Sequence, residues 1–517
     1  MYLKKETIGD CIIHSAQKFK TSYALAFNNE YFSYTELHIL SDILADQFLN
    51  EGIKENDYIG LWGMNSANWI ISFLALTKIG AIPVLMNYNY VLTEVEQIIS
   101  RFQFHYLLIG ELPNSEYEHF NLASKYTDSV KIIDIHSNTL KIKSFINRYN
   151  AISFKSKKST GNAYNKVAAV LFTSGTTSGC KGVMLTHYSV VNNSYAIAAN
   201  LQLTKDDRIC MPLPLFHCFG IFACTLASLQ SGSTLYILQR YRTSHILSCI
   251  TNEKCTVMNG VPTNFLAMIN NASFAPHLVS TIRTGLIAGS SILPQQLKSI
   301  AAQFKNAHFL MAYGQTEASP CISMTTFSDH LFQQINSVGR PLPYVEVRIV
   351  DPDTCSPCPP NTIGEIIARG YNLMTGYFEA TTTPSIRGGW LYTEDLGFLD
   401  NEGYLHITGR KKEMIIRGGE NISPLEIENA ILEYAPVVNV KVIGTTNPIL
   451  QEDITACLVV TDCYNQNELI HLLHNLLSPY KIPTNFLVFD AFPLLTNKKL
   501  DLVMLKKYAE EKLSTES

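Results

Sequence analysis

Alternation between helical and strand-like apolar segments constrains the fold of this chain more than any other sequence feature. A capping pattern, Ser33-x-x-Glu36, precedes a helix with one apolar face, and a short apolar run at 58–62 has the character of a buried strand. A second helix at 69–79 then leads into a strand at 82–86. Strands that alternate with helices form parallel sheets whose faces the helices cover. The sequence therefore predicts an α/β fold.

The apolar run at 167–172 ends abruptly in a segment rich in hydroxyl groups and glycine. This segment consists of Thr173, Ser174, Gly175, Thr176 and Thr177, and Lys181 follows shortly after it. Small residues let the backbone approach a ligand closely, hydroxyl and N–H groups donate hydrogen bonds, and the lysine supplies positive charge. The pattern therefore indicates a polyphosphate site.

This segment differs from the phosphate loop of P-loop proteins, in which a glycine directly precedes the lysine and a serine or threonine directly follows it. Here Cys180 precedes Lys181 and Gly182 follows, so no hydroxyl is placed to hold magnesium in the same way. Some other phosphate chemistry is indicated. The plainer alternative is a turn rich in serine, threonine and glycine.

The character of the sequence changes in its second half. From about Ser337, short strands such as 345–350 and 364–368 alternate with turn signals, which predicts a small barrel-like subdomain. After Gly409 and three basic residues, the remaining segment has strands and helices of its own. We therefore expect a large domain at 1–410 and a smaller α+β domain at 411–517.

Composition argues against several classes of protein. A formal net charge of −4 gives no reason to expect nucleic acid or a polybasic membrane anchor. The 12 cysteines lie mostly in apolar runs, as reduced thiols do. The N-terminus has no apolar signal core, and the longest apolar stretch contains Lys78, Gly80 and Pro83. We expect a cytoplasmic protein without a transmembrane segment, with at most peripheral membrane contact.

Later motifs carry groups that suit a nucleotide. Ala288 and Gly289 follow a strand and offer small residues on which a flat ring could lie. The run Tyr313-Gly314-Gln315-Thr316-Glu317 ends another strand, and Glu317 is an oxygen ligand of the kind that Mg²⁺ takes alongside phosphates. Asp395, expected at a turn, is suited to accept both hydroxyls of a ribose, and Arg410 could donate to the same sugar.

Taken in order, these motifs resemble the adenylate-forming superfamily, which comprises acyl-CoA synthetases, luciferases and the adenylation domains of peptide synthetases. The resemblance extends over nearly the whole chain, as far as Lys499. The segment 415–428, IIRGGENISPLEIE, looks most like fatty-acyl-CoA synthetases, and 313–320 and 337–341 look like their medium-chain members. The resemblance implies a large N-terminal domain of mixed and parallel sheets flanked by helices, with a small β-barrel-like subdomain, and a small mobile α+β C-terminal domain.

The resemblance also implies a reaction in which ATP converts a small-molecule carboxylic acid into an acyl-adenylate with release of pyrophosphate. Lys499 would bind the reacting carboxylate and α-phosphate, Glu317 would hold Mg²⁺, and Thr316 would be a further catalytic group. His217, otherwise a plausible core histidine, would line the acyl tunnel. The contacts to ATP would come from the hydroxyl-rich segment and the strand ends: Thr173, Ser174, Gly175, Thr176, Thr177, Lys181, Ala288, Gly289, Tyr313, Gly314, Gln315, Thr316, Asp395 and Arg410.

In a second step, the thiol of coenzyme A would attack the acyl-adenylate. The resemblance implies that the C-terminal domain rotates about Lys412 and brings Gly418 and Gly419 beside the pantetheine channel. Alignment on Pro493 and Asp501 makes Lys499 the catalytic lysine, and Lys498 is the candidate if the loop is displaced by one residue. Lys498 itself stands where the family has glycine.

Three other positions depart from the family pattern. Ser178, Cys180 and Glu394 stand where the family usually has glycine, proline and glycine. Each leaves a small or polar residue beside an intact functional group, so we expect modest effects on rate.

Two other functions stay open. One is an adenylating enzyme that loads a carrier protein instead of CoA, and the other is a catalytically weak acyl- or nucleotide-binding protein. Apolar or small residues at 216–222, 257–264 and 285–291 are expected to line the acid pocket and favour an aliphatic chain. The length of that chain, and a monomeric or homodimeric state, are left open by the sequence.

Overall fold

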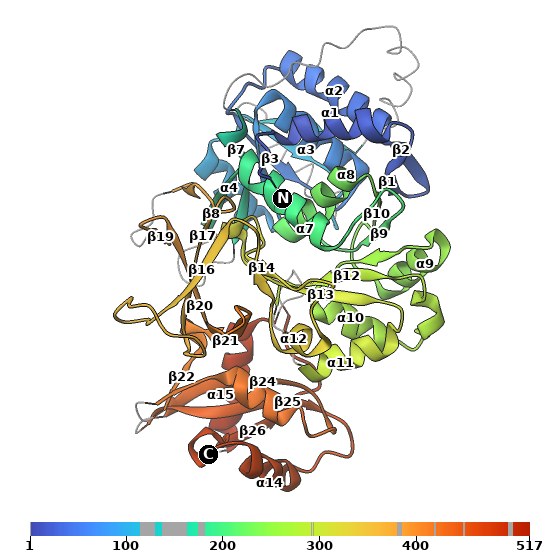
Figure 1. Cartoon of the computed structure of the whole chain (residues 1–517). Coiled ribbons are helices and arrows are strands. Elements are labelled where there is room, and N and C mark those ends of the chain that lie inside the picture. The colour runs from blue at the N-terminus through green and yellow to red at the C-terminus, as the bar shows by residue number, and fades with distance from the viewer. Residues whose placement is uncertain are drawn as a thin grey trace.

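The computed structural model confirms an α/β architecture of large mixed sheets flanked by helices (Figure 1). It describes residues 2–113, 130–136, 163–173, 181–290, 292, 294–379, 385–417, 420–447, 450–494 and 500–516. Helices α1 (Ile8–Phe19), α2 (Tyr34–Glu51) and α3 (Ala67–Ile79) lie at one end of the molecule in Figure 1. The segment from β22 (Ile415–Arg417) to α15 (Leu502–Glu516) lies at the other. In the described parts of the chain, no helix is long and apolar enough to cross a membrane.

One sheet is built around parallel strands from the first third of the chain. Within the described residues the strands follow the order β18 (Gly376–Tyr377), β8 (Lys181–Thr186), β7 (Val167–Thr173), β4 (Ile82–Met86), β3 (Tyr58–Trp62), β5 (Tyr106–Ile109) and β6 (Lys131–Asp134). Neighbouring strands from β7 to β6 in this order pair in parallel, whereas the pairs β7–β8 and β8–β18 are antiparallel.

A second large sheet carries parallel strands in its centre and antiparallel strands at its two edges. Its described strands follow the order β15 (Arg340–Pro341), β14 (Ser323–Met324), β13 (His308–Tyr313), β12 (Thr284–Ile287), β11 (Val257–Met258), β9 (Arg208–Met211), β10 (Thr234–Ile237), β1 (Tyr23–Phe27) and β2 (Glu30–Ser33).

Helices pack against these two sheets and bury a large apolar core between them. The predicted capping pattern is confirmed: Ser33 Oγ accepts from the Glu36 N–H and Glu36 Oε2 accepts from the Ser33 N–H. The described helices of this part of the chain are α1 (Ile8–Phe19), α2 (Tyr34–Glu51), α3 (Ala67–Ile79), α4 (Leu92–Phe102), α7 (His187–Asn200), a π-helical segment (Phe219–Leu226), α8 (Ala227–Ser231), α9 (Thr243–Glu253), α10 (Pro262–Ile269), α11 (Pro294–Gln303) and α12 (Leu331–Asn336).

A smaller antiparallel sheet follows, where the sequence predicts a barrel-like subdomain. Its described strands are β16 (Val345–Val350), β17 (Gly364–Gly370), β20 (Trp390–Leu399), β19 (Ile386–Arg387) and β21 (Leu405–Arg410), with β20 pairing to β17, β19 and β21. The short-strand prediction for this region is therefore confirmed.

The last part of the chain forms an α+β unit with its own apolar cluster. A short turn, Lys411–Glu413, joins it to β21. Its described elements are β22 (Ile415–Arg417), β23 (Glu420–Ile422), α13 (Pro424–Ile431), β24 (Val437–Asn447), β25 (Gln451–Val460), α14 (Gln466–Leu476), β26 (Asn485–Val488) and α15 (Leu502–Glu516). Division of the chain into domains at 1–410 and 411–517 stays a prediction.

Candidate active site

The carboxyl ends of two neighbouring parallel strands bring two predicted motifs side by side. Ile287 ends β12 and pairs with Met311 of β13, so Ala288 and Gly289 lie next to the segment that begins at Tyr313. Gly289 has φ +88°, a conformation that side chains rarely adopt. Ligands of α/β sheets bind at this edge, and the position agrees with a nucleotide site.

Glu317 is buried on a short turn directly after β13. Glu317 is 8% exposed, and the Tyr377 hydroxyl donates a hydrogen bond to Glu317 Oε1 at 3.0 Å. Burial raises the pKa of Glu317, while the Tyr377 hydrogen bond and the charges of Lys181 and Arg410 oppose that rise. Groups from three other elements, β18, β8 and β21, therefore act on this one carboxylate.

Lys181 opens strand β8 and lies opposite Thr173, the last residue of β7. Its ammonium lies 5.0 Å from the centre of the Tyr377 ring. Tyr377 reaches this position because β18 pairs with β8, with Tyr377 opposite Val183. Tyr377 therefore contacts both the lysine and the carboxylate, and it was missed by sequence reasoning because a two-residue strand gives no periodic signal.

Tyr313, Asp395 and Arg410 form a second polar group. The Tyr313 hydroxyl donates to Asp395 Oδ2 at 2.7 Å, and Arg410 Nε lies 3.1 Å from Asp395 Oδ1. The Asp395 side chain is 8% exposed and that of Arg410 is 65% exposed. Burial raises the pKa of Asp395, with Arg410 and Tyr313 acting in the opposite direction.

The expectation that Asp395 lies at a turn is wrong. Asp395 lies within strand β20, opposite Arg410 of β21. The pairing of β20 with β17 shifts register between Glu365 and Ile367, and Glu394 has φ +61°. A bulge therefore redirects the chain inside the strand, as bulges beside active sites often do.

His217 precedes the π-helical segment, and its ring centre lies 4.7 Å from that of Phe216. The next residue, Cys218, places Sγ 3.5 Å from Thr316 Oγ1, so this apolar segment contacts the turn that carries Glu317. Cys218 lies within the segment 216–222 that the sequence predicts to line the acid pocket, but its contact with Thr316 was not predicted, because a cysteine in an apolar run looks like an ordinary core residue.

Several predicted site residues lie outside the described residues: Ser174, Gly175, Thr176, Thr177, Ser178, Cys180, Gly418, Gly419, Lys498 and Lys499. Lys412 is described, and its Nζ lies 2.8 Å from Glu394 Oε2. Its neighbour Lys411 lies 3.7 Å from Glu365 Oε2. Both contacts join the turn after β21 to the small antiparallel sheet.

A divalent cation fits this site only together with other ligands. Glu317 supplies a buried carboxylate, and Thr316 lies beside it in sequence. Among the described residues, no group of three or more His, Cys, Asp or Glu side chains could hold a metal ion. Magnesium commonly takes one or two carboxylates, with phosphates and water completing its shell, and Glu317 fits that role.

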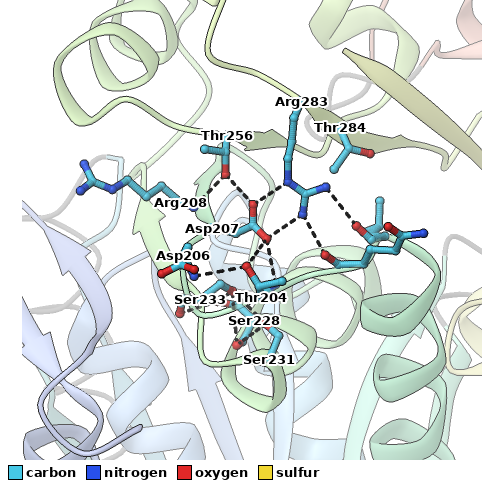
Figure 2. A network of polar contacts seen from close by, with 12 residues as sticks. Thr204, Asp206, Asp207, Arg208, Ser228, Ser231, Ser233, Thr256, Arg283 and Thr284 are labelled. Carbon is cyan, nitrogen blue, oxygen red and sulfur yellow. Dashed lines mark hydrogen bonds and ion pairs between the residues drawn. The ribbon is translucent and has the colours of Figure 1, made fainter. Parts of the chain in front are cut away.

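At the amino ends of β9, β11 and β12, in the same sheet, a polar network around Asp207 joins the strands (Figure 2). Arg283 donates to both carboxylate oxygens of Asp207, at 2.8 and 2.6 Å, and Thr256 Oγ1 donates at 2.8 Å. Burial alone would raise the pKa of Asp207, but the hydrogen bonds from Arg283, Thr204 and Thr256 lower it overall. The network holds the strands at the end opposite to the candidate site.

Comparison with known proteins finds similarity along the whole chain. A family model described as AMP-binding enzyme matches residues 12–378. YngI of Bacillus subtilis (strain 168), which carries a provisional acyl-CoA synthetase name, is 32% identical over 542 residues, covering 99% of this chain and 98% of the relative. The rat mitochondrial medium-chain acyl-CoA ligase ACSF2 is 29% identical over 547 residues, covering 99% and 89%.

A solved structure of similar fold is the o-succinylbenzoate-CoA synthetase MenE from Bacillus subtilis in complex with ATP and magnesium ion. It has a TM-score of 0.79 and 27% identity, and the match covers 96% of this chain and 99% of the other. The same protein in complex with its acyl-adenylate OSB-AMP matches with a TM-score of 0.80.

Proposed function

The chain belongs to the AMP-binding enzyme family, with relatives named as acyl-CoA synthetases and ligases, and we propose that it activates a medium-chain fatty acid with ATP and transfers the acyl group to CoA. The observation that carries the proposal is the meeting of two polar groups at the strand ends. Lys181, Tyr377 and Glu317 form one, and Tyr313, Asp395 and Arg410 form the other.

The first group suits the phosphates of ATP. A carboxylate that attacks an α-phosphate approaches an anion, so positive charge at the site lowers much of the barrier. In the proposal, Lys181 and the segment Thr173 to Thr177 hold the phosphates that leave as pyrophosphate, and Lys499 binds the reacting carboxylate and α-phosphate. The cross-strand position of Thr173 and Lys181 supports this arrangement.

Glu317 is proposed as the protein ligand of Mg²⁺, which when bound neutralises phosphate charge. Tyr377 holds one carboxylate oxygen by its hydrogen bond, and this restricts how the carboxylate can turn. Thr316 is proposed as a neighbouring catalytic group. The contact of Cys218 with Thr316 brings the His217 segment, proposed to line the acyl tunnel, toward that group.

The second group suits the nucleoside. Asp395 is proposed to accept the two ribose hydroxyls and Arg410 to donate to the same sugar, with the Tyr313 ring against adenine. The hydrogen bond from Tyr313 and the ion pair with Arg410 support this role, because they orient the buried carboxylate. Ala288, Gly289, Gly314 and Gln315 are proposed to form the backbone surface beside the base, since they directly follow the paired strands β12 and β13.

For the second step we propose that residues 411–517 rotate about Lys412 relative to residues 1–410, and that Gly418 and Gly419 then lie beside CoA. The short turn Lys411–Glu413 and the separate apolar cluster of the C-terminal part support this division. We propose the cytoplasm as the compartment, supported by the free thiols of the described cysteines, which suit a reducing environment.

A medium-chain aliphatic acid is proposed on two grounds. The π-helical segment beside His217 is largely apolar and buried, which suits an alkyl chain over a charged acid. The relative ACSF2 is named as a medium-chain acyl-CoA ligase.

The test measures ATP–pyrophosphate exchange by the full chain with short-, medium- and long-chain fatty acids and aryl acids. The greatest exchange is expected with medium-chain acids, and a preference for aryl acids would overturn the proposed substrate. Enzyme that holds the acyl-adenylate is then given CoA or a phosphopantetheinyl carrier protein. Transfer to CoA supports the proposal, and transfer to the carrier alone overturns it. If no acid promotes exchange, a binding protein without catalytic activity replaces the whole proposal.

A further inference from the structure

Three cysteines gather beneath helix α9, away from the candidate active site. Cys249 lies in the C-terminal half of α9, Cys255 follows the end of that helix, and Cys210 lies in β9. Sγ of Cys249 lies 3.8 Å from Sγ of Cys255. Cys210 and Cys255 are completely buried, whereas Cys249 is partly exposed.

The chain reversal at the end of α9 creates this proximity. Lys254 has φ +52°, and the turn returns the backbone so that the Cys255 N–H donates to the carbonyl of Ile250 at 3.1 Å. The Cys255 thiol then lies 3.6 Å from the carbonyl oxygen of Cys249. The two thiols are thus held together by the local fold of the helix end.

We propose that Cys249 and Cys255 form a reversible dithiol–disulfide pair, oxidised by a peroxide. The Cys249 thiolate attacks one peroxide oxygen, the O–O bond breaks, and Cys249 becomes a sulfenic acid while the other oxygen leaves as water or an alcohol. The Cys255 sulfur then attacks the Cys249 sulfur. The S–O bond breaks, the S–S bond forms, and the hydroxyl leaves as water with the Cys255 proton. The peroxide accepts the two electrons that the thiols lose.

Exposure and hydrogen bonding assign different roles to the two thiols. Cys249 is the one that solvent reaches, so an oxidant meets it first. Hydrogen bonds from the Cys210 and Cys255 thiols lower the pKa of Cys249, which favours the nucleophilic thiolate. Arg208 donates from its guanidinium to the carbonyl of Glu253 at 2.8 Å, and this places positive charge at the negative end of α9.

Closing the bond requires a modest movement. A disulfide holds its sulfur atoms about 2.05 Å apart, so the 3.8 Å separation must shorten by less than 2 Å, which side-chain rotation can provide. A metal site is the other use that clustered thiols suggest. The part of the chain that the structure describes contains no such metal-binding group, and this favours the redox interpretation.

The sequence permits a direct test, because Lys254 separates the two cysteines. Cleavage after lysine and arginine gives one peptide at 243–254 with Cys249 and another at 255–283 with Cys255. Cys210 lies in a third peptide, 209–240. The first two peptides stay together only if a disulfide joins them.

The full chain is freed of reductant, treated with hydrogen peroxide under native conditions, alkylated and digested without reduction. The expected result is a linked pair 243–254 with 255–283, enriched by about tenfold over untreated protein and lost on treatment with a dithiol. Cys210→Ser and Cys355→Ser variants should retain the link, and Cys249→Ser should lose it.

Three outcomes would overturn the proposal: a link between 243–254 and 209–240 in place of the expected one, oxidation of Cys249 without any link, or a link that forms only in denaturant. The wild-type peptide map decides among them even if a variant fails to fold.

Discussion

Lys412 and Glu394 form an ion pair of 2.8 Å between Nζ and Oε2 across the turn that joins the small antiparallel sheet to the C-terminal part. Glu394 makes this contact from a left-handed backbone conformation, φ +61°, at a position where the resemblance leads us to expect glycine. The left-handed backbone lowers the stability of the folded protein, whereas the ion pair raises it. A side chain in this conformation costs roughly 1 kcal/mol, and an exposed ion pair contributes about 0–1 kcal/mol.

Replacement of Glu394 separates the two effects. Glu394→Gly removes the ion pair and the backbone strain together, so the melting temperature should stay the same or rise. Glu394→Ala removes the ion pair but keeps the strain, so it should be the less stable variant by about 1 kcal/mol. Thermal unfolding of both proteins checks the order. A glycine variant less stable than the alanine variant would show that backbone strain does not govern this position.

Tyr313→Phe tests the hydrogen bond to Asp395 while keeping the ring. The buried carboxylate loses a donor, and an unsatisfied charged group costs about 1–3 kcal/mol. We expect KM for ATP to rise by about tenfold, with kcat less affected. Tyr404→Phe is the matched control, because Tyr404 donates to Asp329 at the same 2.7 Å distance. Equal effects of both changes would refute a specific role for Tyr313.

Glu317→Gln tests the proposed magnesium ligand. The amide oxygen can still accept from Tyr377, but the negative charge is lost. The Mg²⁺ concentration for half-maximal pyrophosphate exchange should rise by about tenfold or more, because a neutral oxygen binds the ion weakly. Tyr377→Phe keeps the carboxylate and should change this concentration much less. The proposal fails if both variants retain the wild-type Mg²⁺ dependence.

Lys499→Ala tests the proposed catalytic lysine. Loss of a cation where charge develops should lower ATP–pyrophosphate exchange by on the order of 10²-fold, and thioester formation from supplied acyl-adenylate should survive. Lys498→Ala serves as the comparison. If Lys498→Ala abolishes exchange and Lys499→Ala does not, the alignment on Pro493 and Asp501 is displaced by one residue.

Asp207→Asn tests the network at the amino ends of the strands. Asp207 has a lowered pKa in the folded protein, so its contribution to stability is complete above the unfolded pKa near 4 and is lost as the pH falls through the lower folded value. We expect the variant to be destabilised by about 2–3 kcal/mol at pH 7, with Arg283 partly exposed and so partly screened.

The difference in melting temperature between wild type and Asp207→Asn should therefore shrink on acidification below pH 4. Asp206→Asn changes an exposed neighbour and should have little effect at either pH. A difference that stays constant with pH would show that the charge of Asp207 is not what stabilises the network.

Strands with continuous apolar runs could be predicted from the sequence. The strands 58–62, 82–86 and 345–350 have the predicted bounds in the structure, because each is a compact run between turn signals. The helix expected at 69–79 begins two residues earlier, at Ala67, where Ser66 caps it. Local patterns of apolar residues, turns and caps are therefore enough to predict these elements.

Pairing between distant segments could not be predicted. Tyr377 reaches Glu317 only because the two-residue strand β18 pairs with β8, almost two hundred positions away in sequence. The contact between Cys218 and Thr316 likewise joins separate elements. The sequence predicts a turn at Asp395, whereas backbone pairing keeps this residue inside β20 and a bulge supplies the bend. Such contacts depend on sheet order, which single-sequence patterns do not encode.

Arg410 is the last residue of β21, and Lys411 begins the turn into the C-terminal part. The residue that pairs with the Asp395 carboxylate is therefore bonded directly to the turn proposed as the hinge. In the proposed mechanism, rotation at this turn displaces Arg410 within one peptide unit, and a ribose that immobilises Arg410 restricts the rotation in return. The proposed sugar contact and the proposed hinge thus share one stretch of backbone, so a substitution in either is expected to affect both.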